Sequence, residues 1–168
     1  RQGLFSVFDS ERAARAFLDS AQVAAYRAHA QEMCSVLLRA TSSRGRWSGQ
    51  DIGVSAALPE GGCVAALTRA SIRPLKAGRF WRRSPLTETA LQDAEGCWLA
   101  VGLGEAPLLR QATFSLWRDQ AAMDAYARSG AHLEALRAAQ REGWFSESMF
   151  VRFQPLQAAG TWKGRVYG

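Results

Sequence analysis

Two histidines, His29 and His132, are the side chains in this sequence best suited to metal or acid–base chemistry. His29 has small and polar neighbours within a helical pattern, which favours a solvated position. His132 follows Gly130 closely, and a glycine lets a flat ligand approach the backbone. A buried neutral imidazole needs a partner for a ring nitrogen, and a metal is one such partner. A purely structural histidine is the alternative, and the residues around His132 leave both readings open.

The number and spacing of the other reactive side chains argue against several classes of site. Cys34, Cys63 and Cys97 are scattered without a Cys-x-x-Cys pair. We therefore expect buried, reduced thiols and neither disulfides nor a zinc site. No Gly-x-Ser-x-Gly motif or phosphate loop occurs, and two histidines are too few to indicate a nucleophilic triad. The lone Gly-x-Gly at 102–104 is more typical of a strand end than of a nucleotide site.

Aromatic and arginine side chains concentrate between residues 69 and 144. The tryptophans there either pack in a core or line an apolar ligand pocket: Trp81, Trp98, Trp117 and Trp144. The arginines form either a solvated face or a set of partners for a ligand carboxylate: Arg69, Arg73, Arg79, Arg82, Arg83 and Arg110. The net charge of +6 suits nucleic acid, an anionic membrane or an acidic ligand, and charge alone does not choose among them.

The elements that position these residues form an internal repeat. An apolar alternating run at 4–9, predicted to be a strand, recurs at 113–118. A helical pattern follows each run, beginning at the N-cap candidates Ser10 and Asp119. Each helix leads to another strand, at 35–39 and 149–153, and then to a Gly-x-Trp-x-Gly tail at 45–49 and 160–164. Aligning the copies on their first strands places His132 opposite Val23, which we expect to face the core.

Between the copies the sequence predicts a linker over 50–62, a strand over 64–71, a helix after Pro74 over about 75–94, and a strand over 97–104. The second half then has the β-α-β-β-α-β order of a ferredoxin-like module, and the first half has only its last β-α-β. We predict an α+β fold of two tandem ferredoxin-like half-modules, bounded at 1–49 and 63–168. A lone β-α-β leaves a sheet edge uncovered, so we expect the first module to be incomplete at its N-terminus.

Targeting and membrane signals are not apparent in the sequence. No run of 18 apolar residues occurs, and the first residues resemble neither a signal peptide nor a transit peptide. We expect a cytoplasmic protein, with peripheral contact to a membrane left open.

Four stretches resemble the spheroidene monooxygenase family. They are TSSRGRWSG at 41–49, ALTRASIRP at 66–74, GLGEAPLLRQATFSLW at 102–117, and the segment 130–145, which runs from GAH to EGWF. The family is haem-containing and uses dioxygen and external electrons to add a keto group to an acyclic carotenoid. The resemblance therefore implies a haem-dependent monooxygenase. By analogy, haem proteins of the related dimeric α/β-barrel class also present an axial histidine from a helix.

The resemblance also implies roles for individual residues. The Gly-x-His pattern carries the iron-ligand role onto His132 and makes Gly130 a cofactor contact. A neutral His132 would hold the iron and leave its opposite face for dioxygen. Arg110 and Gln111, at the start of a strand, are the candidate catalytic donors to dioxygen. The remaining residues expected to contact haem lie in the second module: Arg69, Trp98 and Trp117.

Partners follow from the same resemblance. We expect an apolar small-molecule substrate and an electron donor such as a ferredoxin or a reductase, with a homodimer left open. No basic and aromatic RNA-binding run occupies a predicted strand, so nucleic acid is not expected. The closest alternatives are a haem-binding or haem-degrading protein and a haem enzyme that acts on a small molecule other than a carotenoid.

Overall fold

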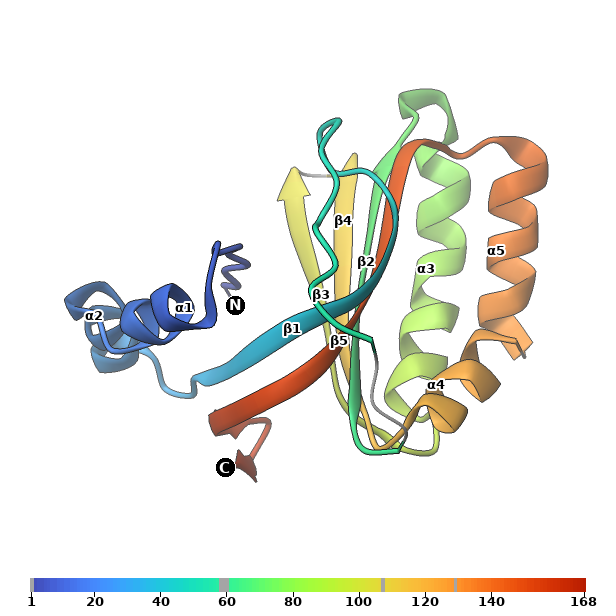
Figure 1. Cartoon of the computed structure of the whole chain (residues 1–168). Helices are drawn as coiled ribbons and strands as arrows, with labels where there is room; N and C mark the ends of the chain where they lie inside the picture. Colours follow the sequence, from blue (N-terminus) through green and yellow to red (C-terminus); the bar gives the residue numbers. More distant parts are fainter. Residues whose placement is uncertain (1, 58–60, 107, 129) are drawn as a thin grey trace. The chain divides into compact units, whose positions relative to one another are not determined.

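The computed structural model describes residues 2–57, 61–106, 108–128 and 130–168. The chain divides into two compact units (Figure 1). Unit 1 comprises Arg1–Leu38 and Pro155–Gly168, and unit 2 comprises Arg39–Gln154. Two long strands, β1 (Cys34–Gly45) and β5 (Phe145–Trp162), contribute residues to both units.

Unit 2 is an antiparallel sheet covered on one face by helices (Figure 1). Its strands β2 (Val64–Ile72), β3 (Cys97–Ala106) and β4 (Arg110–Trp117) join the others in the order β1-β5-β2-β4-β3. The 3-10 turn η1 (Pro74–Lys76) leads into α3 (Ala77–Gln92), and α4 (Gln120–Ala127) and α5 (Gly130–Glu142) connect β4 to β5. The order β2-α3-β3-β4-α4-α5-β5 confirms the predicted ferredoxin-like module.

The sheet of unit 2 buries side chains on both faces. On the helix side, Val64, Ala66 and Trp117 pack with Leu91 and Met123. On the other side, Leu67, Met149 and Val151 are almost completely inaccessible to solvent. Residues 46–57 run over that second side, away from α3 and α5 (Figure 1). Apolar residues are therefore needed on both faces of β2, which explains its nearly continuous apolar sequence.

Unit 1 contains α1 (Glu11–Leu18), α2 (Ala21–His29) and the short strand β6 (Arg165–Tyr167), which pairs with β5. Ser10 Oγ accepts a hydrogen bond of 3.2 Å from Ala13 N, so the predicted N-cap is confirmed. Val23 is buried, as its place in the repeat predicted.

The second copy of the repeat follows the prediction closely. Asp119 Oδ1 accepts from Ala122 N at 2.8 Å and caps α4. Pro74 occupies the first position of the turn that opens α3. The single helix expected after Asp119 is divided in two, because α4 ends at Ala127 and Gly130 has a positive φ of 52°.

The strand predicted at 4–9 is wrong, because residues 2–8 form neither strand nor helix. Its counterpart β4 lies between β2 and β3, and both of those strands come from the part of the chain that has no equivalent in the first copy. An alternating sequence needs neighbouring strands to pair with before it becomes a strand. The module boundaries at 49 and 63 stay predictions, and residues 58–60 of the expected linker lie outside the described residues.

Candidate functional site

His132 lies in the first turn of α5, on the helix-covered side of unit 2. Its ring centroid is 4.8 Å from that of Tyr126, which lies 5.5 Å from the ring of Trp117. Three elements, β4, α4 and α5, thus contribute one aromatic stack. Tyr126 Oη donates to the carbonyl of Thr87 at 3.2 Å, which ties the stack to α3.

Burial sets the protonation states in this stack. Burial lowers the pKa of His132, so the neutral imidazole is favoured. Burial, with a smaller contribution from the charge of Cys97, raises the pKa of Tyr126 to about 12, so its phenol keeps its proton. Among the described residues, no hydrogen bond to either ring nitrogen of His132 is assigned. A neutral imidazole with unengaged nitrogens has the chemistry of a metal ligand.

Gly130 leaves room beside His132. Apart from the neighbouring residues and the backbone of its own helix, no described atom lies within 4 Å of the position that a Cβ on Gly130 would occupy. The backbone at the start of α5 is therefore open to close approach, as expected for a ligand contact.

Trp117 is a core residue in the structure. It is only 1% exposed, and its Nε1 donates to Ser115 Oγ at 2.9 Å. Trp98 lies on β3, beside a register shift, and is 36% exposed. Trp117 belongs to the aromatic stack that contains His132.

The two candidate donors on β4 point to opposite faces of the sheet, because neighbouring residues of a strand alternate. Gln111 is paired with Ala70, on the helix-side face that also carries Trp117. Arg110 is paired with Ser71 and lies on the other face, where its Nη1 is 3.3 Å from Glu105 Oε1. The structure thus separates Arg110 from the side on which His132 lies.

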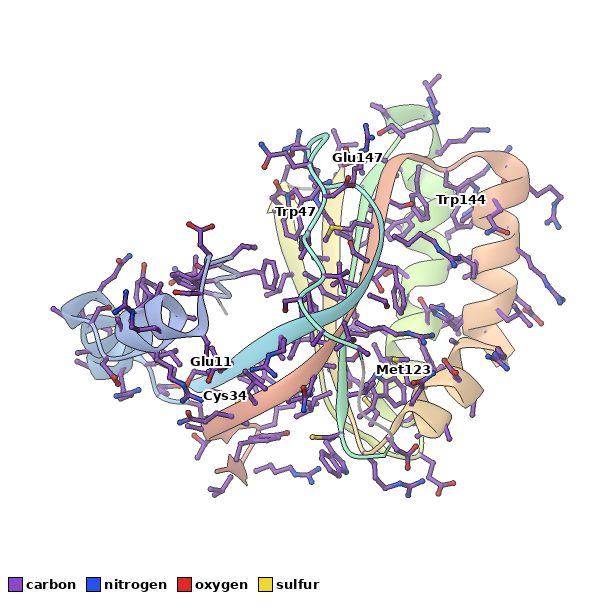
Figure 2. All side chains as sticks on the ribbon, viewed as in Figure 1. Glu11, Cys34, Trp47, Met123, Trp144 and Glu147 are labelled. Carbon is purple, nitrogen blue, oxygen red and sulfur yellow. The ribbon has the colours of Figure 1, made fainter. Side chains whose placement is uncertain are left out.

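Arg69 also lies on the face away from the helices, and it is 1% exposed. Its Nε is 3.0 Å from Glu105 Oε2, and its Nη1 is 2.7 Å from Glu147 Oε2. Its guanidinium carbon lies 4.8 Å from the ring centroid of Trp47. Figure 2 shows Trp47 and Glu147 at the same end of unit 2. Two carboxylates and an aromatic ring therefore already hold the guanidinium that we predicted to contact haem.

Glu147 joins this cluster to the first Gly-x-Trp-x-Gly tail. Its carboxylate accepts from Ser48 N at 2.9 Å and from Gly49 N at 2.8 Å. These backbone bonds first, and then Arg69, lower the pKa of Glu147.

The second tail has the same arrangement within unit 1. Glu32 accepts from Lys163 N at 3.0 Å and from Gly164 N at 2.7 Å. Aligned on the tails, Glu32 corresponds to Glu147. Our sequence reasoning missed both glutamates, and their matching positions in the repeat were the signal that would have found them.

Other groups that could bind metal or react are dispersed in the described parts of the chain. All three cysteines are free and half-buried there, and burial raises the pKa of Cys34 and Cys97. Within these ranges no three His, Cys, Asp or Glu side chains gather in a way that would hold a metal ion. Among the described helices, none is both long and apolar enough to cross a membrane.

Comparisons with known proteins identify close relatives, although no family model matches the chain. Proteins named spheroidene monooxygenase match from Rubrivivax gelatinosus with 56% identity, from Rhodobacter capsulatus with 39% and from Cereibacter sphaeroides with 36%. The alignments cover 100%, 96% and 94% of this chain. The chain spans 65%, 69% and 49% of the lengths of these relatives, respectively.

Solved structures match parts of the chain at low sequence identity. Rv0793 from Mycobacterium tuberculosis matches with a TM-score of 0.50 and 20% identity, over 56% of this chain and 96% of that chain. SnoaB from Streptomyces nogalater, a cofactor-independent oxygenase, matches with a TM-score of 0.47 and 16% identity, over 57% of this chain and 95% of that chain.

Proposed function

We propose that this chain, which belongs to the spheroidene monooxygenase family, carries the haem-binding module of an oxygenase that acts on an apolar, carotenoid-like substrate. The identity of 56% over the whole chain to a protein of that name is the observation that carries the proposal. The haem would supply the dioxygen chemistry, and the protein would supply its ligand, its pocket and access to it. Electrons would come from a separate donor such as a ferredoxin or a reductase.

His132 is the residue that we propose would hold the haem iron. Three observations support it: the ring is half-buried and neutral, its nitrogens have no assigned hydrogen bond among the described residues, and Gly130 beside it is open. A metal ligand also needs a fixed ring orientation. The contact with Tyr126 provides one, because the stacked rings restrict rotation of the imidazole.

Gln111 keeps its proposed role as a donor to dioxygen on the criterion of sheet face alone, because it lies six residues, about 20 Å, from Trp117 along β4. It lies on the helix-side face with Trp117, whereas Arg110 lies on the opposite face and is paired with Glu105. The proposed role of Arg69 as a haem contact is weakened by its two carboxylate partners. Trp98 keeps its proposed role as a cofactor contact.

The test is a haemin titration of the full chain and of His132→Ala, followed by absorption spectroscopy. We expect one haem per chain for the parent protein. We expect the variant to lose the histidine-ligated spectrum and at least tenfold in haem affinity, because loss of a group that merely orients a metal ligand already costs about 10–100-fold. Added imidazole should restore the spectrum of the variant, because it can enter the space that the side chain has left.

His29→Ala is the matched control, since His29 is exposed on α2 and its Nδ1 lies 2.8 Å from the carbonyl of Ala25. Its haem spectrum should equal that of the parent. An unaltered spectrum in His132→Ala would show that another residue binds the iron. Product analysis with a reductant then separates substrate oxygenation from degradation of the haem itself.

A further inference from the structure

One end of unit 2 carries an excess of positive charge. Between Arg73 and Thr87 the sequence has five basic residues and no acidic residue. The end of β2, the start of α3 and the turn from β3 to β4 all lie at this end (Figure 1). Two hydrogen bonds to backbone carbonyls join these segments. Ile72 N donates to the carbonyl of Leu109 at 2.7 Å, and Trp81 Nε1 donates to the carbonyl of Leu108 at 3.0 Å.

The carboxylates at this end are already paired with other cations. Glu142 is 2.9 Å from Arg79, while Glu105 and Glu147 hold Arg69. By contrast, no ion pair is assigned to Arg73, Lys76 or Arg82 within the part of the chain that the structure describes. These three cations are therefore available to an external anion.

Two exposed leucines belong to the same end of unit 2. Leu75, between Arg73 and Lys76, is 96% exposed, and Leu108 is 61% exposed. Leu108 also has a φ of 63°, a left-handed conformation that costs free energy for a bulky residue. The side chain recovers little of that cost through burial. A strained residue with an exposed apolar side chain indicates a surface that is selected for contact with something else.

We propose that this basic–leucine patch, formed by Arg73, Leu75, Lys76, Arg82 and Leu108, binds the surface of an anionic lipid bilayer. Unpaired cations attract anionic headgroups, and aliphatic side chains enter the boundary between headgroups and acyl chains. Charge alone would also fit an acidic protein, but the two exposed leucines favour the bilayer. The inference goes beyond the proposed function, because it rests on the surface alone and needs neither haem nor turnover.

The test is co-sedimentation of the full chain with vesicles of phosphatidylcholine alone and of phosphatidylcholine mixed with phosphatidylglycerol. We expect binding only to the anionic vesicles, and weaker binding at high salt. The triple variant Arg73→Gln, Lys76→Gln and Arg82→Gln should lose binding by on the order of a hundredfold, since each cation contributes about fivefold. The matched control removes three exposed cations elsewhere and keeps the same net charge: Arg12→Gln, Arg27→Gln and Arg44→Gln.

Leu108→Asn separates docking from a structural role. Asparagine tolerates a positive φ better than leucine, so the melting temperature should stay the same or rise. Vesicle binding should nevertheless fall, because the apolar side chain is lost.

The proposal is wrong if both triple variants bind anionic vesicles equally, or if Leu108→Asn binds them as the parent does. It is also wrong if the parent protein does not co-sediment with anionic vesicles and instead binds an acidic ferredoxin through the same three cations. That last outcome would make the patch a protein-docking site. Because the assay uses the chain without haem, its failure is distinguishable from failure of the iron ligand assignment.

Discussion

Glu147 shows how a single side chain organises one end of unit 2. Its two oxygens accept from consecutive backbone amides of the first Gly-x-Trp-x-Gly tail, and one of them also pairs with buried Arg69. Stacking of Arg69 on Trp47 links the charge cluster back to the same tail. One carboxylate therefore satisfies backbone donors and balances a buried cation at the same time.

Replacement of Glu147 by glutamine should destabilise the protein in a pH-dependent manner. The folded-state pKa is lowered, so the ionised carboxylate contributes stability above the unfolded pKa of about 4.3, and that contribution is lost as the pH falls through the folded-state value. Glu147→Gln should therefore melt at a lower temperature than the parent at pH 7, and the gap should narrow below about pH 4.

Thermal melts from neutral to acidic pH, followed by circular dichroism, measure this gap. Glu134→Gln, at an exposed position of α5, is the control and should match the parent throughout. A gap that stays constant over the whole pH range would mean that the ionised form of Glu147 has no special stabilising role.

At the scale of elements, each Gly-x-Trp-x-Gly tail forms a turn at the end of a long strand, where two backbone segments approach closely. The first glycine of each tail has a positive φ, 84° for Gly45 and 104° for Gly160. A Cβ at either position would collide with a backbone carbonyl, that of Ser148 for Gly45 and that of Met33 for Gly160. The glycines are thus required twice over, by backbone conformation and by close approach.

Gly45→Ala and Gly160→Ala should each lower the free energy of unfolding by about 2 kcal/mol, because alanine is strained at positive φ and its Cβ has no space. Gly78→Ala is the control, since Gly78 lies in α3 and, apart from its neighbours and its own helix backbone, no described atom is within 4 Å of the position that its Cβ would take. It should be neutral or stabilising by up to about 1 kcal/mol. Urea denaturation measures all three, and equal stabilities would contradict the backbone requirement.

At the scale of the whole molecule, the two copies of the repeat differ in the strands that surround them. Both copies contain two helices, the first of them capped by a side chain, followed by a long strand and a carboxylate-bound turn. Within the described residues, β2 and β3 precede the second copy, and there the first run of the repeat becomes a strand, β4. The difference follows from hydrogen-bonding partners and not from the run itself, since 4–8 and 113–117 have similar alternating sequences.

Hydrogen exchange followed by mass spectrometry should report this difference. Amides of 113–117 lie in a strand with a neighbour on each side and should exchange slowly, near the rate of global unfolding. Amides of 3–8 should exchange much faster, because these residues form no strand. Equal protection of the two segments would show that the first run also pairs as a strand in solution.

The sequence by itself determined the features that depend on neighbours along the chain. Ser10 and Asp119 cap helices because a short side-chain oxygen reaches amides three residues away. Pro74 opens the turn before α3 because its fixed φ suits a helix start. Alternation along β4 was enough to place Arg110 and Gln111 on opposite faces.

Only the tertiary structure decided which face of the sheet the helices cover, and therefore that Gln111 rather than Arg110 lies on the side of His132. It also decided that Glu147 binds a turn about a hundred residues earlier in the chain, and that Arg69 is buried between two carboxylates. These contacts join residues that are distant in sequence. Their geometry depends on strand register and packing, which local patterns do not specify.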